Sequence, residues 1–181
     1  MLDKLRISIK FLEFDRIITN FIRVNMKGSK KVTDKQEARV KAEHYCAYQE
    51  RSQQEVRTKL QSFDLPYADI EELISELIQA NFLNEERFAR TYALGKFRIK
   101  NWGKNKIKQG LKLKQVPEKL IMKVLKQLDE QDYSHTLLVL LNKKAALLQE
   151  YDTFKRNYKL MQYALGKGYE RDLITDVLKE L

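Results

Sequence analysis

A lysine-rich stretch in the middle of the chain carries the side chains best suited to chemistry with a ligand. Residues 97–114, FRIKNWGKNKIKQGLKLK, hold seven Lys or Arg, one Trp and no acid. Ammonium groups along a helix bind phosphates, and an aromatic ring beside them stacks on nucleobases. A helix would present on one side the four lysines that recur every four residues: Lys100, Lys104, Lys108 and Lys112. This pattern predicts a surface that binds a polyanion.

The net charge of the chain is concentrated in the same region. Residues 96–126 contain eleven Lys or Arg and a single acid, Glu118, for a net charge of +10. The remaining chain contains 24 bases and 24 acids and sums to zero. Because like charges repel at helical spacing, an unrelieved ridge of this kind costs stability unless a polyanionic partner neutralises it. The alternative interpretation is a patch that only keeps the protein soluble.

The candidate contact residues are the bases and the tryptophan of this stretch: Arg98, Lys100, Trp102, Lys104, Lys106, Lys108, Lys112 and Lys114. Trp102 has two interpretations. Beside Gly103 it fits a half-buried anchor, whereas among so many bases it also fits a ring that stacks on a nucleobase or contacts a partner. We expect the anchor.

The other residue types give no catalytic or metal-binding constellation. The two histidines, His44 and His135, lie more than 90 positions apart, without ligand spacing to the lone cysteine, Cys46. The chain also lacks a phosphate-binding glycine loop and a nucleophile elbow. We therefore expect a non-enzymatic protein with no metal or cofactor and a buried Cys46. A single cysteine suits the cytoplasm, and no apolar window is long enough to span a membrane.

Three tandem repeats of about 50 residues must position these side chains. A shift of 51 residues aligns 51–77 with 102–128 and superimposes the only two prolines, Pro66 and Pro117. A further shift of 53 carries the apolar pattern onto the C-terminal third. Apolar residues at three- and four-residue spacing predict helices. The sequence thus predicts an all-α protein whose three three-helix repeats stack into an elongated, curved array.

Capping residues help to divide the chain. Ser52 and Glu55 predict a capping box, and Asn84 precedes two acids that favour a helix N-terminus. The three repeats are expected at 34–83, at 84–131 (the basic repeat) and at 132–181.

Residues 1–33 form an N-terminal extension outside the repeats. Their apolar residues predict one amphipathic helix that packs on the first repeat. The alternative, which we favour, is that the natural start is Met26 and that the preceding residues are translated upstream sequence.

Four short motifs occur in order: ERSQQEVRTKL (50–60), NFLNEERFART (81–91), WGKNKIKQGL (102–111) and GKGYERDLI (166–174). Arg51-Ser52, the run Glu86-Arg87-Phe88-Ala89 and Trp102-Gly103 within them match one family pattern. Over roughly residues 36–181, the chain resembles the RecX family of recombination regulators.

This resemblance implies a three-repeat, all-helical modulator of the RecA recombinase without catalytic activity. Such proteins bind the RecA–single-stranded DNA filament along its groove, obstruct its growth, and inhibit strand exchange and coprotease activity; some also bind DNA directly. The resemblance further implies a monomer in the cytoplasm that acts in DNA repair, homologous recombination and the SOS response.

Two other classes of function stay open on the residues alone. A helical-repeat module that binds nucleic acid without the recombinase would share the charge evidence and would bind naked single strands with a steep salt dependence. A scaffold that joins other proteins would be indifferent to DNA. The leading hypothesis is a regulator whose partners are the recombinase filament and single-stranded DNA.

Overall fold

The structure, a computed structural model, describes residues 34–181. Within that range every regular element is an α-helix, and the nine helices form three groups of three. The predicted all-α repeat fold is therefore confirmed. The N-terminal extension, with its predicted helix and the alternative start at Met26, lies outside the described residues.

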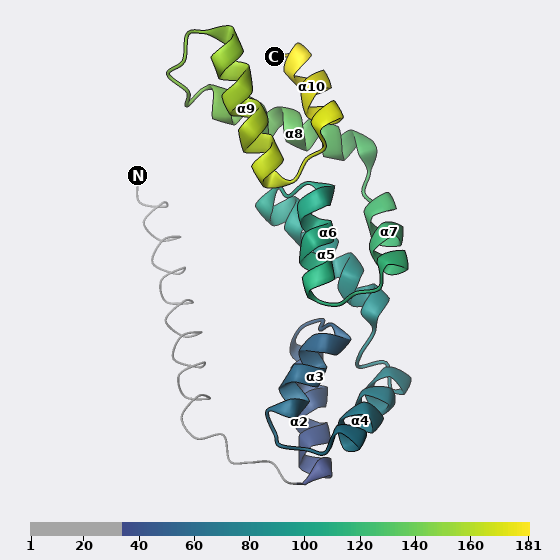
Figure 1. The fold of residues 1–181 in the computed structure, drawn as a ribbon. Helices are drawn as coiled ribbons and strands as arrows, with labels where there is room; N and C mark the ends of the chain where they lie inside the picture. The colour runs from purple at the N-terminus through teal and green to yellow at the C-terminus, as the bar shows by residue number, and fades with distance from the viewer. Residues whose placement is uncertain (1–33) are drawn as a thin grey trace, which may run out of the picture.

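The three groups follow the chain in order. The first contains α2 (Lys35–Tyr48), α3 (Gln53–Gln61) and α4 (Tyr67–Gln79). The second contains α5 (Glu85–Lys100), α6 (Lys104–Leu113) and α7 (Glu118–Lys126). The third contains α8 (Glu130–Ala145), α9 (Thr153–Lys167) and α10 (Arg171–Lys179). They stack end to end into a long, curved column (Figure 1).

The third repeat begins slightly earlier than the predicted boundary between 131 and 132. Asp129 is the N-cap of α8, and its carboxylate accepts a hydrogen bond from the backbone N–H of Asp132 at 2.8 Å. Helix α8 therefore starts at Glu130, two residues before the predicted repeat.

Side-chain caps start helices where the sequence predicts them. The Ser52 hydroxyl accepts from the backbone N–H of Glu55 at 3.1 Å, while the Glu55 carboxylate accepts from the backbone N–H of Ser52 at 3.0 Å. Both halves of the capping box are thus present at α3. Asn84 caps α5 by accepting from the backbone N–H of Arg87 at 2.9 Å.

The turn into the third helix is built alike in the first two repeats. Pro66 precedes α4 and Pro117 precedes α7, and each proline has an extended backbone that the helix then follows. Two positions earlier, Asp64 and Gln115 both adopt left-handed conformations, with φ of 56° and 58°. The repeat seen in the sequence is therefore also a repeat of backbone conformation.

The hydrophobic residues form two separate cores. The first repeat has its own core, made by ten residues besides Cys46: Ala38, Ala42, Val56, Leu60, Phe63, Ile70, Leu73, Ile74, Leu77 and Leu83. The second and third repeats share one continuous core that includes Phe97, Tyr133 and Tyr169. The column therefore consists of two packed units: the first repeat alone, and the second and third repeats together.

The second and third repeats meet through their backbones at two glycines. The backbone N–H of Gly103 donates to the carbonyl of Lys167 at 2.9 Å, and that of Asn105 donates to the carbonyl of Gly168 at 3.0 Å. A Cβ atom at Gly103 would overlap the carbonyl group of Gly168. Gly168 also ends α9 with a φ of 93°, a conformation that favours glycine. The start of α6 is therefore held directly against the end of α9.

Tyr133 reinforces this junction from inside the shared core. Its hydroxyl accepts from the backbone N–H of Lys104 at 2.7 Å and donates to a carboxylate oxygen of Glu170 at 2.8 Å. Its ring lies 5.7 Å from the ring of Phe97 and 5.0 Å from that of Tyr169, between centroids. Burial raises the pKa of Tyr133, so its hydroxyl stays protonated and keeps both hydrogen bonds.

Polar contacts connect the first repeat to the second. The Arg87 guanidinium pairs with Glu50 at 2.6 Å, and the Lys114 ammonium pairs with Glu55 at 2.8 Å. The backbone N–H of Gln53 donates to Glu85 at 2.7 Å. The two cores do not merge at this junction, so the first repeat is held to the second mainly by charge.

The two glycines Gly103 and Gly95 should respond oppositely to alanine. Gly103→Ala places a methyl group where the Gly168 backbone lies, so we expect the free energy of unfolding to fall by about 1–3 kcal/mol. Gly95→Ala meets no atom within 4 Å inside α5, so we expect a gain of up to about 1 kcal/mol from helix propensity. Urea denaturation followed by circular dichroism measures both. Equal effects of the two substitutions would contradict the close approach.

Candidate functional site

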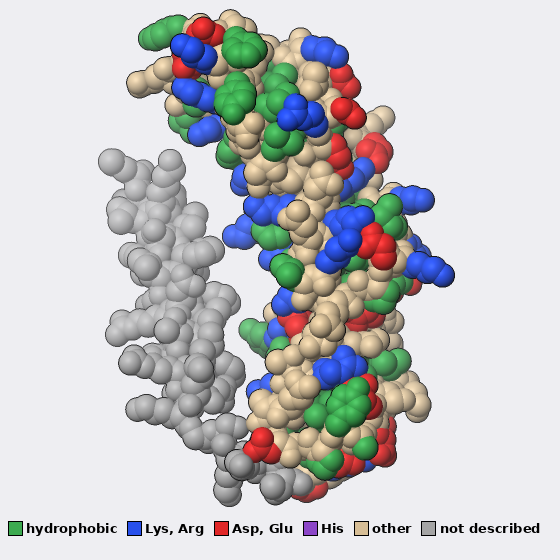
Figure 2. Space-filling model, in the orientation of Figure 1, with side chains coloured by type: hydrophobic (Ala, Val, Ile, Leu, Met, Phe, Trp, Pro, Cys, Tyr) green, Lys and Arg blue, Asp and Glu red, His purple; other side chains and the backbone are tan. Residues whose placement is uncertain are grey.

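The second repeat carries the positive charge of the described chain. The predicted second repeat, residues 84–131, contains thirteen Lys or Arg against five acids, a net charge of +8, and two of these acids, Asp129 and Glu130, belong to the start of α8. The predicted first repeat, residues 34–83, has six bases and ten acids, a net charge of −4. The predicted third repeat, residues 132–181, has eight bases and seven acids, a net charge of +1. Lys and Arg side chains gather over the middle of the column (Figure 2). An anionic partner is therefore attracted to the centre of the array.

Helix α6 carries four of the predicted contact residues, and three of them form a row. Lys104, Lys108 and Lys112 follow one another along one side of the helix, which packs on α7. All three ammonium groups find carboxylates: Lys104 lies 2.6 Å from Glu130, while Lys108 and Lys112 lie 2.6 Å and 3.1 Å from the two oxygens of Glu118. The three lysines form one row, as the spacing predicts.

The expectation of an unrelieved ridge is wrong for these lysines, because internal acids neutralise part of the row. Hydrogen bonds from Lys108 and Lys112 hold the pKa of Glu118 below its usual value, so this carboxylate is charged at neutral pH. Its side chain is half exposed, however, and ion pairs at the surface contribute only about 0–1 kcal/mol. A phosphate group can therefore replace Glu118 at little cost.

A second group of bases lines a hollow between the first two repeats. Lys96, Lys100 and Lys114 contribute to this hollow of about 400 Å³, together with residues of α5 and of the α2–α3 connection. Lys114 pairs across it with Glu55. Lys100 is exposed and has no ion-pair partner among the described residues. A partner that enters the hollow therefore meets Lys100 directly and shares Lys114 with Glu55.

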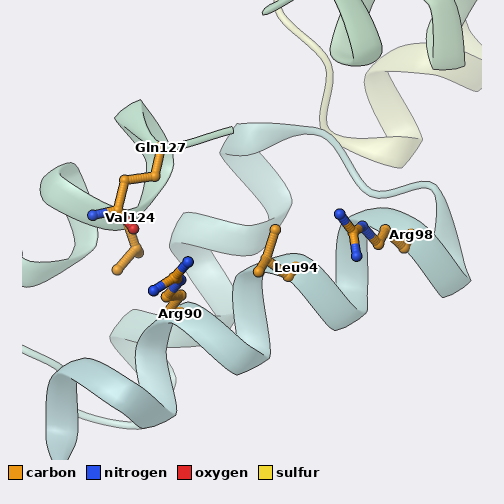
Figure 3. Close-up of a pocket in the computed structure, with 5 residues that line it drawn as sticks. All are labelled: Arg90, Leu94, Arg98, Val124 and Gln127. Atoms are coloured by element: carbon orange, nitrogen blue, oxygen red, sulfur yellow. The ribbon is translucent and has the colours of Figure 1, made fainter. Parts of the chain in front are cut away.

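Arg98 lies on a different face, in a pocket of about 320 Å³ between α5 and α7. Figure 3 shows Arg90, Leu94 and Arg98 in a row along α5, with Val124 on the neighbouring α7 and Gln127 directly after its end. Both arginines are exposed, and neither has an ion-pair partner within the described part of the chain. Guanidinium groups beside an apolar floor suit a bidentate anion.

Trp102 and Lys106 belong to the junction with the third repeat. Trp102 is half-buried and packs against the shared core, so the anchor interpretation is confirmed. The ammonium groups of Lys96 and Lys106 lie 5.2 Å and 5.1 Å from the centre of its ring. Lys106 also donates to the carbonyl of Gly166 at 2.9 Å. Its charge therefore points away from the row on α6.

The structure thus divides the eight predicted contact residues among several surfaces. Arg98 and Lys100 are neighbours in sequence, yet two positions on a helix lie roughly 200° apart, and the two side chains line different pockets. Sequence reasoning did not single out Arg90 and Lys96, which line the same two pockets as Arg98 and Lys100. The four-residue steps from Arg90 to Leu94 and from there to Arg98 were the available signal.

The described residues give no catalytic or metal-binding arrangement. No group of three or more His, Cys, Asp or Glu in the range 34–181 could hold a metal ion. Cys46 is 6% exposed, and burial raises the pKa of its thiol to about 11, so it is an unreactive core residue, as predicted. No helix that the structure describes is both long and apolar enough to cross a bilayer.

Three stacked three-helix units with a basic middle unit define a helical repeat protein of the kind that binds another macromolecule. Family models match all three units: the first three-helix domain of RecX at 38–77, the second at 84–125 and the third at 130–178. The chain belongs to the RecX family.

Relatives and solved structures agree with this assignment. The chain is 32% identical over 133 residues to a regulatory protein RecX of Clostridium perfringens, covering 72% of this chain and 62% of the relative. It is 28% identical over 172 residues to that of Bacillus mycoides, covering 95% of this chain and 61% of the relative. The chain thus spans less than two thirds of the length of either relative.

The fold is also that of two crystal structures. One, of RecX from Lactobacillus salivarius, superimposes with a TM-score of 0.76 at 25% identity and covers 81% of this chain and 96% of that chain. Another, of a regulatory protein RecX, gives a TM-score of 0.74 at 20% identity over 81% of this chain and 73% of that chain. The three-repeat array is therefore a fold shared with solved proteins.

The junction between the first two repeats makes a prediction about pH. Burial by itself raises the pKa of Glu55, but hydrogen bonds from Lys114 and from the backbone of Ser52 outweigh burial and leave the pKa lowered. In Lys114→Gln the pKa of Glu55 should therefore rise, as measured by NMR titration of its carboxyl carbon. Because the pKa of Glu55 is lower in the folded protein than the unfolded value of about 4.3, the ionised carboxylate stabilises the fold at pH values above about 4.3. This stabilisation is lost as the pH falls through the folded pKa.

The free energy of unfolding of the wild type should consequently exceed that of Lys114→Gln at neutral pH, and the difference should shrink below about pH 4. Lys112→Gln is the matched control, because Lys112 pairs with Glu118. A Glu55 pKa that is the same in Lys114→Gln and in the wild type would contradict this role of the ion pair.

Proposed function

We propose that this protein regulates homologous recombination by binding the RecA–single-stranded DNA filament, obstructing its growth and so inhibiting strand exchange and coprotease activity. It acts by binding and not by catalysis. Support comes from its RecX membership, since its relatives are named regulatory proteins. The observation that carries the proposal is the net +8 of the second repeat at the centre of an elongated array.

The shape of the array suits a partner that is itself long. The three repeats extend along one axis, so a filament can contact several of them at once (Figure 1). The basic repeat meets the phosphates of the DNA or acidic side chains of the recombinase, and the flanking repeats extend the contact. A protein bound in this way covers positions that further recombinase subunits must reach, which obstructs filament growth.

The electrostatic attraction comes from the predicted contact residues, namely Arg98, Lys100, Lys104, Lys106, Lys108, Lys112 and Lys114, with Trp102 beside them. Those without a carboxylate partner attract an anion directly. Those paired with Glu118 or Glu130 exchange a weak surface ion pair for a phosphate, whereas Lys114 shares its charge with Glu55. Counterions released from the DNA then favour the complex at low salt.

Reversing the charge of the three lysines on α6 tests this proposal. Changing Lys104, Lys108 and Lys112 together to Glu replaces attraction by repulsion at the centre of the array, and we expect binding to recombinase-coated strands to fall by at least about 100-fold. Fluorescence anisotropy measures the affinity, and circular dichroism checks the helical content.

The matched control changes Lys41, Lys59 and Lys179 to Glu. These lysines lie in the first and third repeats, so the net charge changes equally while the second repeat keeps its charge. Equal losses in both triple variants would show that only overall charge matters, and unchanged binding of the α6 variant would remove the row from the mechanism.

Removal of Glu118 should have the opposite effect. Glu118→Gln abolishes the carboxylate that competes for Lys108 and Lys112, so we expect binding to coated strands to tighten by about threefold to tenfold at low salt. Glu37→Gln, which frees Lys41 in the first repeat, is the control and should change little. Weaker binding by Glu118→Gln would mean that Glu118 itself contacts the partner or orders the row.

A further inference from the structure

Large apolar side chains are exposed where α8 connects to α9. Leu147 is 79% exposed, Tyr151 100%, Phe154 82% and Tyr158 59%. Burying a large aromatic side chain is strongly favourable, so a group of them left in solvent marks an interaction surface. These four residues, the α9 aromatic patch, are far in sequence from the contact residues of the second repeat.

The geometry of α9 gathers the aromatic rings. Phe154 and Tyr158 are four residues apart and therefore share one side of the helix, and Tyr151 precedes Phe154 by three residues, just before the helix begins. In Figure 2, apolar side chains gather over the end of the column formed by the third repeat, with charged side chains of both signs among them. The patch thus places aromatic rings next to charged groups.

The segment 147–159 contains three bases and two acids, a net charge of +1. Lys155 and Lys159 each directly follow an aromatic residue of α9 and lie one turn apart, so they form a row next to the rings, whereas Arg156 lies roughly 200° from both rings. The nearby acids are already engaged: Asp152 caps the helix by accepting from the backbone N–H of Lys155 at 3.0 Å, and Glu150 pairs with Lys159 at 2.8 Å. The side chain of Lys155 has no such partner among the described residues, so it offers a free cation beside the rings. Lys159 can exchange its surface ion pair with Glu150 for a phosphate at little cost.

We propose that the α9 aromatic patch binds single-stranded nucleic acid, with unpaired nucleobases stacked on Phe154, Tyr158 and Tyr151 and with phosphates on Lys155 and Lys159. Aromatic rings next to Lys or Arg side chains are the arrangement that binds single strands without sequence preference. A duplex is a poor ligand because its bases are stacked on one another and do not expose their faces.

Charge argues against the occupants that the chain itself could supply. Residues 1–33 contain eight Lys or Arg and three acids, so that segment is positive like the patch. A second copy of the patch would bring the same positive charge. A polyanion with exposed aromatic faces is complementary to both properties of the surface, and single-stranded nucleic acid has both.

This inference goes beyond the proposed function, because it needs neither the recombinase nor the lysines of α6. In the whole protein, the patch on the third repeat binds bare single strands, while the second repeat binds the filament. The two claims therefore fail separately: one is measured on bare strands and the other on coated strands.

The test compares variants of the full chain on a fluorescent oligothymidylate without recombinase. The double variant Phe154→Ala/Tyr158→Ala should bind at least about fivefold more weakly for each ring that stacks on a base in the wild type. Lys155→Gln/Lys159→Gln should reduce the slope of log K against log salt by about 0.7 for each phosphate that these two side chains neutralise. Photocrosslinking of bound strand should label the peptide 151–159.

The chain offers a matched control in its first repeat. Tyr48 and Tyr67 are also highly exposed, at 81% and 68%, and Tyr48→Ala/Tyr67→Ala should leave the affinity for oligothymidylate unchanged. An abasic strand of equal length should bind the wild type as weakly as oligothymidylate binds the Phe154/Tyr158 variant.

Three results would overturn the proposal. The first is an unchanged affinity of the Phe154/Tyr158 variant for bare strand. The second is equal binding of abasic and thymidine strands by the wild type. The third is a Phe154/Tyr158 variant that binds only coated strands more weakly, because that outcome assigns the patch to the recombinase protein.

Discussion

The backbone of Gly103 lies directly against the backbone of Gly168, and the orientation of the basic repeat depends on this contact. Two backbone hydrogen bonds and the hydroxyl of Tyr133 hold the start of α6 there, inside a core that two repeats share. The lysines of α6 therefore project from a frame twice the size of one repeat. A side chain at Gly103 would separate the two repeats and turn the row of lysines away from its present direction.

The junction with the first repeat follows a different principle. It rests on ion pairs such as Lys114 with Glu55, between a repeat of net −4 and one of net +8. The same carboxylates that hold the array together also occupy its cations, as Glu118 does within the second repeat. An anionic partner therefore competes with internal acids, and its binding depends on displacing weak surface ion pairs. This competition determines how many of the positive charges of the second repeat can bind a filament.

Sequence reasoning recovers what local rules determine. The two prolines, the capping box at Ser52 and Glu55 and the apolar spacing predict three repeats of helices, because each signal acts within a few residues. The partners of the lysines, by contrast, depend on residues that are distant in the sequence. Lys114 meets Glu55 across 59 positions, and Lys106 meets the carbonyl of Gly166 across 60. No periodicity within α6 reports such contacts, so the single strip that the sequence predicts is divided among several surfaces.

The central claim is that the array recognises a recombinase filament and not simply negative charge. Competition binding measures this most directly: a labelled complex with recombinase-coated single strands is challenged with unlabelled coated strands, with bare strands of equal length, and with free recombinase at the same salt concentration. We predict that coated strands compete at clearly lower concentrations than either component alone. Equal or better competition by bare strands would contradict the claim and would favour a module that binds nucleic acid without the recombinase.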